Sequence, residues 1–108
     1  MTDHRTTVIT GLRDLAAYFE ANPDVPLPWH GISVQYFPAR ADDKAMRADI
    51  DHVAALLGTE IDPEDLPFGH YKTALSFGPV RYEALAVLAN ARARHEASNS
   101  YRDNIAIT

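Results

Sequence analysis

Apolar residues recur at helical spacing in two segments of the first half of the chain. Between Thr10 and Asn22 they lie three or four positions apart, at Leu12, Leu15, Ala16 and Phe19. Thr10 is suited to cap the amino end of this helix, and Pro23 stops it after Asn22, because proline disfavours the helical conformation of the residue before it. A longer helix is expected from Asp42, its cap, to Gly58, its stop. The buried stripe of this second helix comprises Met46, Ile50, Val53, Ala54 and Leu57.

A stiff connector, a strand and an acidic loop are predicted around these helices. Three prolines in residues 23–28 fix φ and indicate an extended connector. Apolar and polar residues alternate from Ile32 to Phe37, which is typical of a half-buried strand, and Pro38 ends it. Residues 59–69 contain two prolines and four acidic residues, which predict an acidic loop with room for one short helical turn.

The strongest local signal is a β-hairpin over residues 70–88, centred on Gly78-Pro79. Glycine supplies the positive φ that the first central position of a type II′ turn needs, and proline fits the second position. The register that follows pairs Phe77 with Val80, Leu75 with Tyr82, Thr73 with Ala84 and Tyr71 with Ala86. Helix propensity favours a competing interpretation, one long alanine-rich helix over residues 82–97. With the hairpin, a helix over residues 89–99 and a polar, frayed tail over 98–108 complete the chain.

The predicted order of elements is α-β-α-β-β-α, which indicates a single α+β domain over residues 1–108 with frayed ends at residues 1–8 and 99–108. We expect a small three-stranded antiparallel or mixed sheet with the helices packed on one face. Such a sheet leaves one face and two edges uncovered. Pairing of two copies through an edge or a face would cover them, and we therefore expect a homodimer.

Composition narrows the class of protein. The chain has 108 residues, of which 46% are hydrophobic, but so many of these are alanine that the expected core is thin. Cysteine is absent, which excludes disulfides, a thiolate nucleophile and cysteine-based metal sites. There is no run of about 18 apolar residues and no apolar signal segment at the start of the sequence. We therefore expect a cytoplasmic protein without a membrane span.

Residues that could perform catalysis or bind a metal are few. None of the five histidines has a metal-ligand spacing, and we expect neither a metal nor another cofactor. Asp49 and His52 share one helical face and could form a metal pair or an acid–base dyad, although a solvated helix surface explains them more simply. The sequence contains no strained nucleophile turn and no glycine-rich phosphate loop, so it indicates no enzyme class.

One face of the predicted hairpin gathers four charged or titratable side chains: His70, Lys72, Arg81 and Glu83. Because side chains alternate between the two faces of a strand, the register places all four on the polar side, which becomes apolar at Leu85. Together they could bind a small anionic ligand or transfer a proton, since histidine titrates near neutral pH. The alternative is a polar sheet face that contacts solvent or a protein partner.

Two further regions are candidate interaction surfaces. Trp29 follows the proline connector and either covers the core as a lid, the interpretation we favour, or anchors an interface. The last helix presents Arg92, Arg94 and His95 among small alanines, which allow a partner to approach closely. Its arginines could pair instead with the acidic first half of the chain or, together with Arg102, bind nucleic-acid phosphates. The net charge of −5 argues against a general nucleic-acid coat.

Four short segments also resemble a known group of sequences. They are Ile9–Leu15 (ITGLRDL), Asn22–Pro26 (NPDVP), Phe77–Val80 (FGPV) and Ala91–His95 (ARARH). Together they resemble an uncharacterised family of short hypothetical proteins from high-GC Gram-positive bacteria and their phages, and the resemblance spans most of the chain. It implies a bacterial cytoplasmic setting and a phage or other mobile-element origin, and it supports the hairpin. It implies no catalytic residue, cofactor or ligand.

These observations lead us to expect a small non-enzymatic protein-interaction module that forms a homodimer. Its contact surface would be the outer face of the hairpin or the last helix, because the thin core and the open sheet edges favour association. The alternatives are a small-ligand or anion-binding protein, or a small enzyme, acting around His70, and a nucleic-acid-binding protein acting through the last helix.

Overall fold

The structure of the protein, a computed structural model, describes residues 3–93. Contacts within the chain divide it into two compact units, Met1–His30 and Gly31–Thr108. The single domain expected over residues 1–108 stays a prediction. Within residues 3–93, no helix has both the length and the apolar character needed to cross a membrane.

The first unit contains one helix, α1 (His4–Ala21). Its amino end is capped by Asp3, whose carboxylate accepts a hydrogen bond of 2.7 Å from the Thr6 N–H. The helix therefore begins at His4 and not at the expected cap Thr10, and residues 4–8, expected to fray, are helical. It ends as predicted at Asn22, before the first proline. None of its residues is buried, and its apolar side chains Val8, Ile9, Leu12, Leu15 and Tyr18 are all 40% or more exposed.

The connector after α1 forms neither helix nor strand, as its prolines predict. Trp29 lies near its end and is 91% exposed. Its indole ring meets the ring of His30 edge-on, with 4.8 Å between the ring centroids. Trp29 belongs to the first unit and the core to the second, so the interpretation that Trp29 covers the core as a lid stays a prediction.

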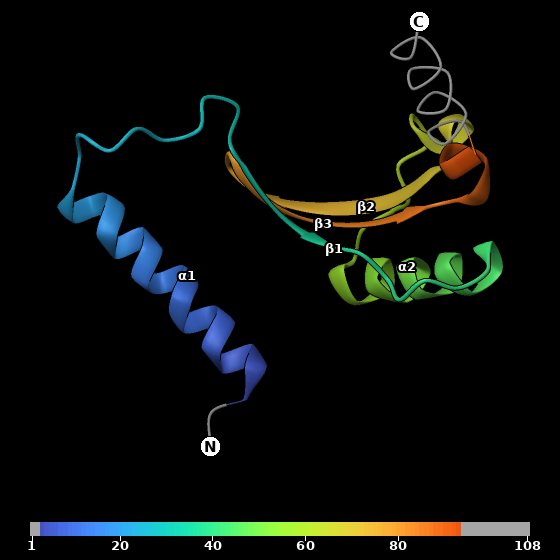
Figure 1. The fold of residues 1–108 in the computed structure, drawn as a ribbon, viewed down its shortest axis with the longest axis horizontal. Helices are drawn as coiled ribbons and strands as arrows, with labels where there is room; N and C mark the ends of the chain where they lie inside the picture. The colour runs from blue at the N-terminus through green and yellow to red at the C-terminus, as the bar shows by residue number, and fades with distance from the viewer. Residues whose placement is uncertain (1–2, 94–108) are drawn as a thin grey trace, which may run out of the picture. The chain divides into compact units, whose positions relative to one another are not determined.

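The second unit is built on a mixed three-stranded sheet (Figure 1). Its strands are β1 (Ile32–Tyr36), β2 (His70–Phe77) and β3 (Val80–Val87), in the spatial order β1-β3-β2. The middle strand β3 is antiparallel to β2 and parallel to β1. The predicted α+β class and the predicted order of elements are confirmed.

The hairpin has the predicted turn and the predicted register. Gly78 adopts a φ of 61°, as the first central position of the turn requires. Phe77 pairs with Val80 and Tyr71 with Ala86, so the long helix over residues 82–97 is excluded. The chain becomes helical again at residue 89 and is described as helix up to residue 93. The remainder of the helix expected over 89–99, and the tail over 98–108, lie outside the described residues.

The core of this unit lies between α2 (Asp43–Leu57) and one face of the sheet (Figure 1). Both predicted ends of α2 are confirmed, because Asp42 caps its amino end and Gly58 takes the left-handed conformation at its carboxyl end. Within residues 3–93, the buried hydrophobic residues are Met46, Ile50, Ala54, Ala84, Ala86 and Leu88. Half of them are alanines, so the core is as thin as the composition predicts.

The start of β1 depends on a close backbone approach at Gly31. This residue has a φ of 99°, and a Cβ atom added to it would lie 2.3 Å from the Pro79 carbonyl oxygen. Next to it, the Ile32 N–H donates to that same oxygen over 3.0 Å. Glycine at position 31 therefore lets β1 join the sheet directly beside the hairpin turn.

Candidate functional site

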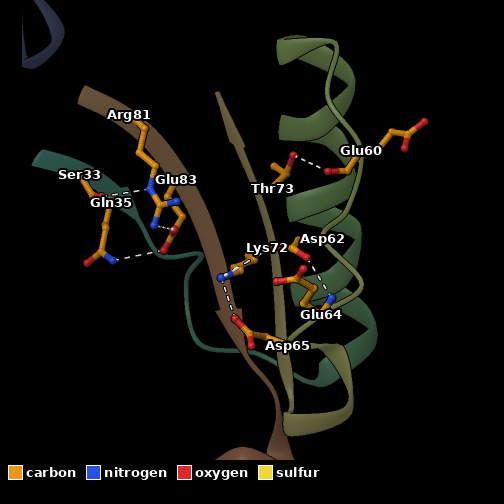
Figure 2. A network of polar contacts seen from close by, with 10 residues as sticks. All are labelled: Ser33, Gln35, Glu60, Asp62, Glu64, Asp65, Lys72, Thr73, Arg81 and Glu83. Atoms are coloured by element: carbon orange, nitrogen blue, oxygen red, sulfur yellow. Dashed lines mark hydrogen bonds and ion pairs between the residues drawn. The ribbon is translucent and has the colours of Figure 1, made fainter. Parts of the chain in front are cut away.

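The polar face of the sheet is the side opposite α2, and it contains all four predicted ligand-binding residues. On β2 and β3, strand alternation places His70, Lys72, Glu83 and Arg81 on this face. The parallel pairing of β1 adds Ser33 beside Arg81 and Gln35 beside Glu83. Figure 2 shows the side chains of Ser33 and Gln35 on β1 extending toward those of Arg81 and Glu83 on β3. The polar face thus spans all three strands.

Glu83 is the centre of the polar face and is only 5% exposed. Its Oε2 lies 2.9 Å from Nη2 of Arg81, and its Oε1 accepts a hydrogen bond of 3.3 Å from Gln35 Nε2. Arg81 also donates from Nε to Ser33 Oγ over 3.2 Å (Figure 2). These bonds compensate the carboxylate for its loss of water, and they tie the side chains of β1 to those of β3.

Lys72 is engaged with the acidic loop that precedes β2. Its Nζ lies 2.7 Å from Asp65 Oδ2 and 3.9 Å from Asp62 Oδ2 (Figure 2). The hydrogen bond from Lys72 holds the pKa of Asp65 below its ordinary value of 3.8. The same bond raises the pKa of Lys72 above its ordinary value of 10.5. The charge of Lys72 is therefore used to fasten the loop.

His70 lies at the opposite end of the polar face from Arg81, opposite Val87 on β3. Its charge acts on Asp65, whose pKa it lowers as the smallest of several causes. Lys72 and Arg81, the lysine and the arginine predicted to hold an anion, are thus already paired with carboxylates of this chain. These pairs count against an anion site on the polar face, and that function stays a prediction.

The face of the sheet that packs on α2 also contains polar contacts that the sequence did not indicate. The Tyr36 hydroxyl donates to Asp49 Oδ2 over 2.6 Å, and this bond raises the pKa of Tyr36. The Tyr71 hydroxyl donates to Asp51, and burial is the main cause that raises the pKa of Tyr71. Asp49, considered above as the partner of His52, therefore has a structural partner. Within residues 3–93, no three side chains of the metal-ligating types come together in a possible metal site.

The two edges of the sheet differ. The edge of β2 is covered by the acidic loop, where the Asp62 N–H donates to the Lys72 carbonyl over 2.9 Å and Thr73 Oγ1 donates to the Glu60 carbonyl over 3.0 Å. At the edge of β1, the described residues of the second unit form no such hydrogen bond, since the backbone bond of Ile32 to Pro79 is directed to the hairpin side. Periodicity could not show this difference, because it does not reveal which strand ends up outermost.

Of the interaction residues predicted on the last helix, Arg92 lies within the described part of the chain. Its Nη1 donates to the Val87 carbonyl over 3.3 Å, which joins the helix to the end of β3. Arg94, His95 and Arg102 lie outside the described residues. Nucleic-acid binding through these arginines stays a prediction.

In comparisons with protein-family models, with curated proteins and with solved structures, no match to this chain was found.

Proposed function

We propose that this protein is a small non-enzymatic interaction module that works as a homodimer, in which two copies pair through the uncovered edges of β1. The observation that carries the proposal is the contrast between the two edges, since the acidic loop forms a backbone hydrogen bond with the β2 edge and the described residues form none with the outer edge of β1. The bacterial cytoplasmic setting and the phage or mobile-element origin implied by the resemblance belong to the same proposal.

The geometry of β1 specifies how two copies would pair. The Ile32 N–H points to β3, where it donates to the Pro79 carbonyl. Because backbone groups alternate along a strand, Ser33 and Gln35 direct their N–H and C=O groups to the open edge. Identical strands related by a two-fold axis run antiparallel, so Ser33 of each copy would exchange hydrogen bonds with Gln35 of the other. Val34 would then lie on the axis, opposite its own copy.

Two further observations support association. The core contains few large side chains, and a small unit gains stability when it buries more surface in a dimer. In addition, α1 described by itself leaves its apolar side chains about half exposed, which is a common feature of helices that pack against a partner.

The test substitutes Val34, the residue that would lie opposite Val34 of the other copy. Val34 is 36% exposed in the single chain, so Val34→Lys and Val34→Glu are expected to leave the fold of the monomer intact. In the dimer each variant places two like charges directly opposite each other, which opposes pairing. Light scattering coupled to size exclusion, at micromolar concentration, is expected to show a wild-type dimer and monomers of each variant. An equimolar mixture of the two variants is expected to restore a dimer, because lysine then faces glutamate.

The matched control is Phe77→Lys, which replaces another exposed apolar residue on the opposite edge strand and is expected to leave the dimer unchanged. A wild-type monomer would overturn the proposal. A wild-type dimer that persists in both Val34 variants would show that a different surface joins the copies, and would overturn the pairing through β1.

A further inference from the structure

A pocket of about 300 Å³ lies beside Leu85 and Val87, the apolar residues at the end of the polar face. It is formed by the loop between β1 and α2, the end of β3, the first turns of α2 and the helix that follows Leu88. Its main lining residues are Phe37, Arg40, Met46, Leu85, Val87 and Arg92. None of them belongs to the open edge of β1, so the pocket is a feature separate from the proposed dimer contact.

The pocket combines apolar walls with two positive charges. Phe37, Leu85 and Val87 are apolar residues of the lining, and Arg40 and Arg92 are its two cationic residues. Small-molecule sites typically have this composition, an apolar lining with a few converging polar groups.

The two arginines differ from the cations of the polar face. Lys72 and Arg81 are both paired with carboxylates, but among the described residues neither Arg40 nor Arg92 forms an ion pair. Arg92 donates one N–H, from Nη1, to the Val87 carbonyl. A guanidinium has five N–H donors in a planar fork, so most of the donors of Arg92 remain available to an anion. The positive charge of the pocket therefore favours an anionic ligand.

We infer that this pocket binds a small amphiphilic carboxylate, with the carboxylate between Arg40 and Arg92 and the hydrocarbon part against Phe37, Leu85 and Val87. Planar carboxylates match the guanidinium fork in two parallel hydrogen bonds. If each heavy atom takes about the volume of a water, roughly 30 Å³, the pocket holds on the order of ten non-hydrogen atoms. A medium-chain fatty acid or an aryl alkanoate has this size. The inference goes beyond the proposed function and does not rest on dimer formation.

The test is a calorimetric titration of the wild-type protein with octanoate, which has an apolar chain and a carboxylate of the right size. Three companion probes separate the contributions: 1-octanol has the chain alone, acetate has the carboxylate alone, and inorganic phosphate is an anion without apolar surface. Octanoate is expected to bind with saturation and at least tenfold more tightly than each companion. Backbone amide shifts in a ¹⁵N spectrum are expected to change at Leu85 and Val87.

Three substitutions decide whether the arginines are responsible. Arg40→Gln and Arg92→Gln each remove a charge-assisted hydrogen bond, which corresponds to octanoate binding roughly ten- to a hundredfold more weakly. Lys44→Gln removes an exposed charge of α2 outside the pocket and is expected to leave the affinity unchanged. Saturable binding of octanoate that both arginine variants retain, shifts confined to α1, equal binding of phosphate, or no binding of octanoate would each overturn the inference. Light scattering of the same samples reports the dimer independently.

Discussion

At the scale of single residues, Glu83 determines the stability of the polar face. This residue is 5% exposed, and its only cationic contact within 4 Å among the described residues is Arg81. A buried charge that loses its partner destabilises a fold more than the intact pair stabilises it. Arg81 therefore contributes to stability mainly because it pairs with Glu83, which would otherwise be a buried charge without a cation.

The pairing of Glu83 with Arg81 predicts that substitutions at these two residues are non-additive. Arg81→Met is expected to lower the free energy of unfolding by about 1–3 kcal/mol, the cost of an uncompensated buried group. The value stays below that for a fully buried pair because the Arg81 side chain is 47% exposed. Adding Glu83→Gln is expected to recover part of the loss, because the neutral amide keeps its hydrogen bond to Gln35. Urea denaturation measures both variants, and additive losses in the double variant would contradict the argument.

At the scale of elements, local sequence patterns predicted what depends on neighbours in the chain. The turn at Gly78 follows from the φ that glycine allows, and the register follows from the turn. The caps of α2 follow from Asp42 and Gly58. The predicted start of α1 was wrong because Asp3 and Thr10 are both residues of a type that caps helices. Only the hydrogen bond from the Thr6 N–H identifies Asp3 as the cap.

The candidate site shows the same division. Period-two alternation was enough to place His70, Lys72, Arg81 and Glu83 on one face. Their partners could not be predicted. Asp65 comes from a loop whose path no periodicity describes, and Gln35 comes from a strand whose neighbour in the sheet the sequence did not specify. The acidic run just before β2, followed by a lysine, was the one local signal for the bond between Lys72 and Asp65.

The ion pair between Lys72 and Asp65, which fastens the acidic loop to β2, predicts that the free energy of unfolding depends on pH. Folding lowers the pKa of Asp65, so this carboxylate stabilises the fold above its ordinary pKa of 3.8, and the contribution disappears as the pH falls through the lowered value. The raised pKa of Lys72 means that its own contribution is complete below 10.5 and is lost only at higher pH. The Lys72–Asp65 bond is therefore fully effective between these two limits.

Asp65→Asn tests this dependence. Between about pH 5 and pH 2 the wild type is expected to lose more of its free energy of unfolding than the variant does, because the variant has already lost the bond. Glu64→Gln is the control, since it removes a carboxylate of the same loop that makes no ion pair among the described residues, and it is expected to follow the wild type. Urea midpoints at each pH provide the measurement. Equal acid sensitivity of the wild type and Asp65→Asn would exclude the bond as its cause.

At the scale of the whole molecule, the thin core and the open edge of β1 have a joint consequence. Among the described residues of the second unit, six hydrophobic residues are buried and three of them are alanine, so pairing of two copies would add a substantial share of its stability. When folding is coupled to dimer formation, stability rises with protein concentration by mass action. A monomer has no such dependence, and the thermal midpoint therefore reports association without any label or ligand.

We therefore expect the Tm of the wild type to rise by roughly 3–5 °C for each tenfold increase in protein concentration, the size expected for a coupled dimer of about 100 residues per chain. The Tm of Val34→Lys is expected to be lower and independent of concentration, because its like charges prevent pairing while the intramolecular bonds of β1, such as that from Ile32 to Pro79, remain. Circular dichroism melts over a hundredfold range of concentration make the comparison. A wild-type Tm that does not change over this range would mean that the stability of the fold owes nothing to a second copy.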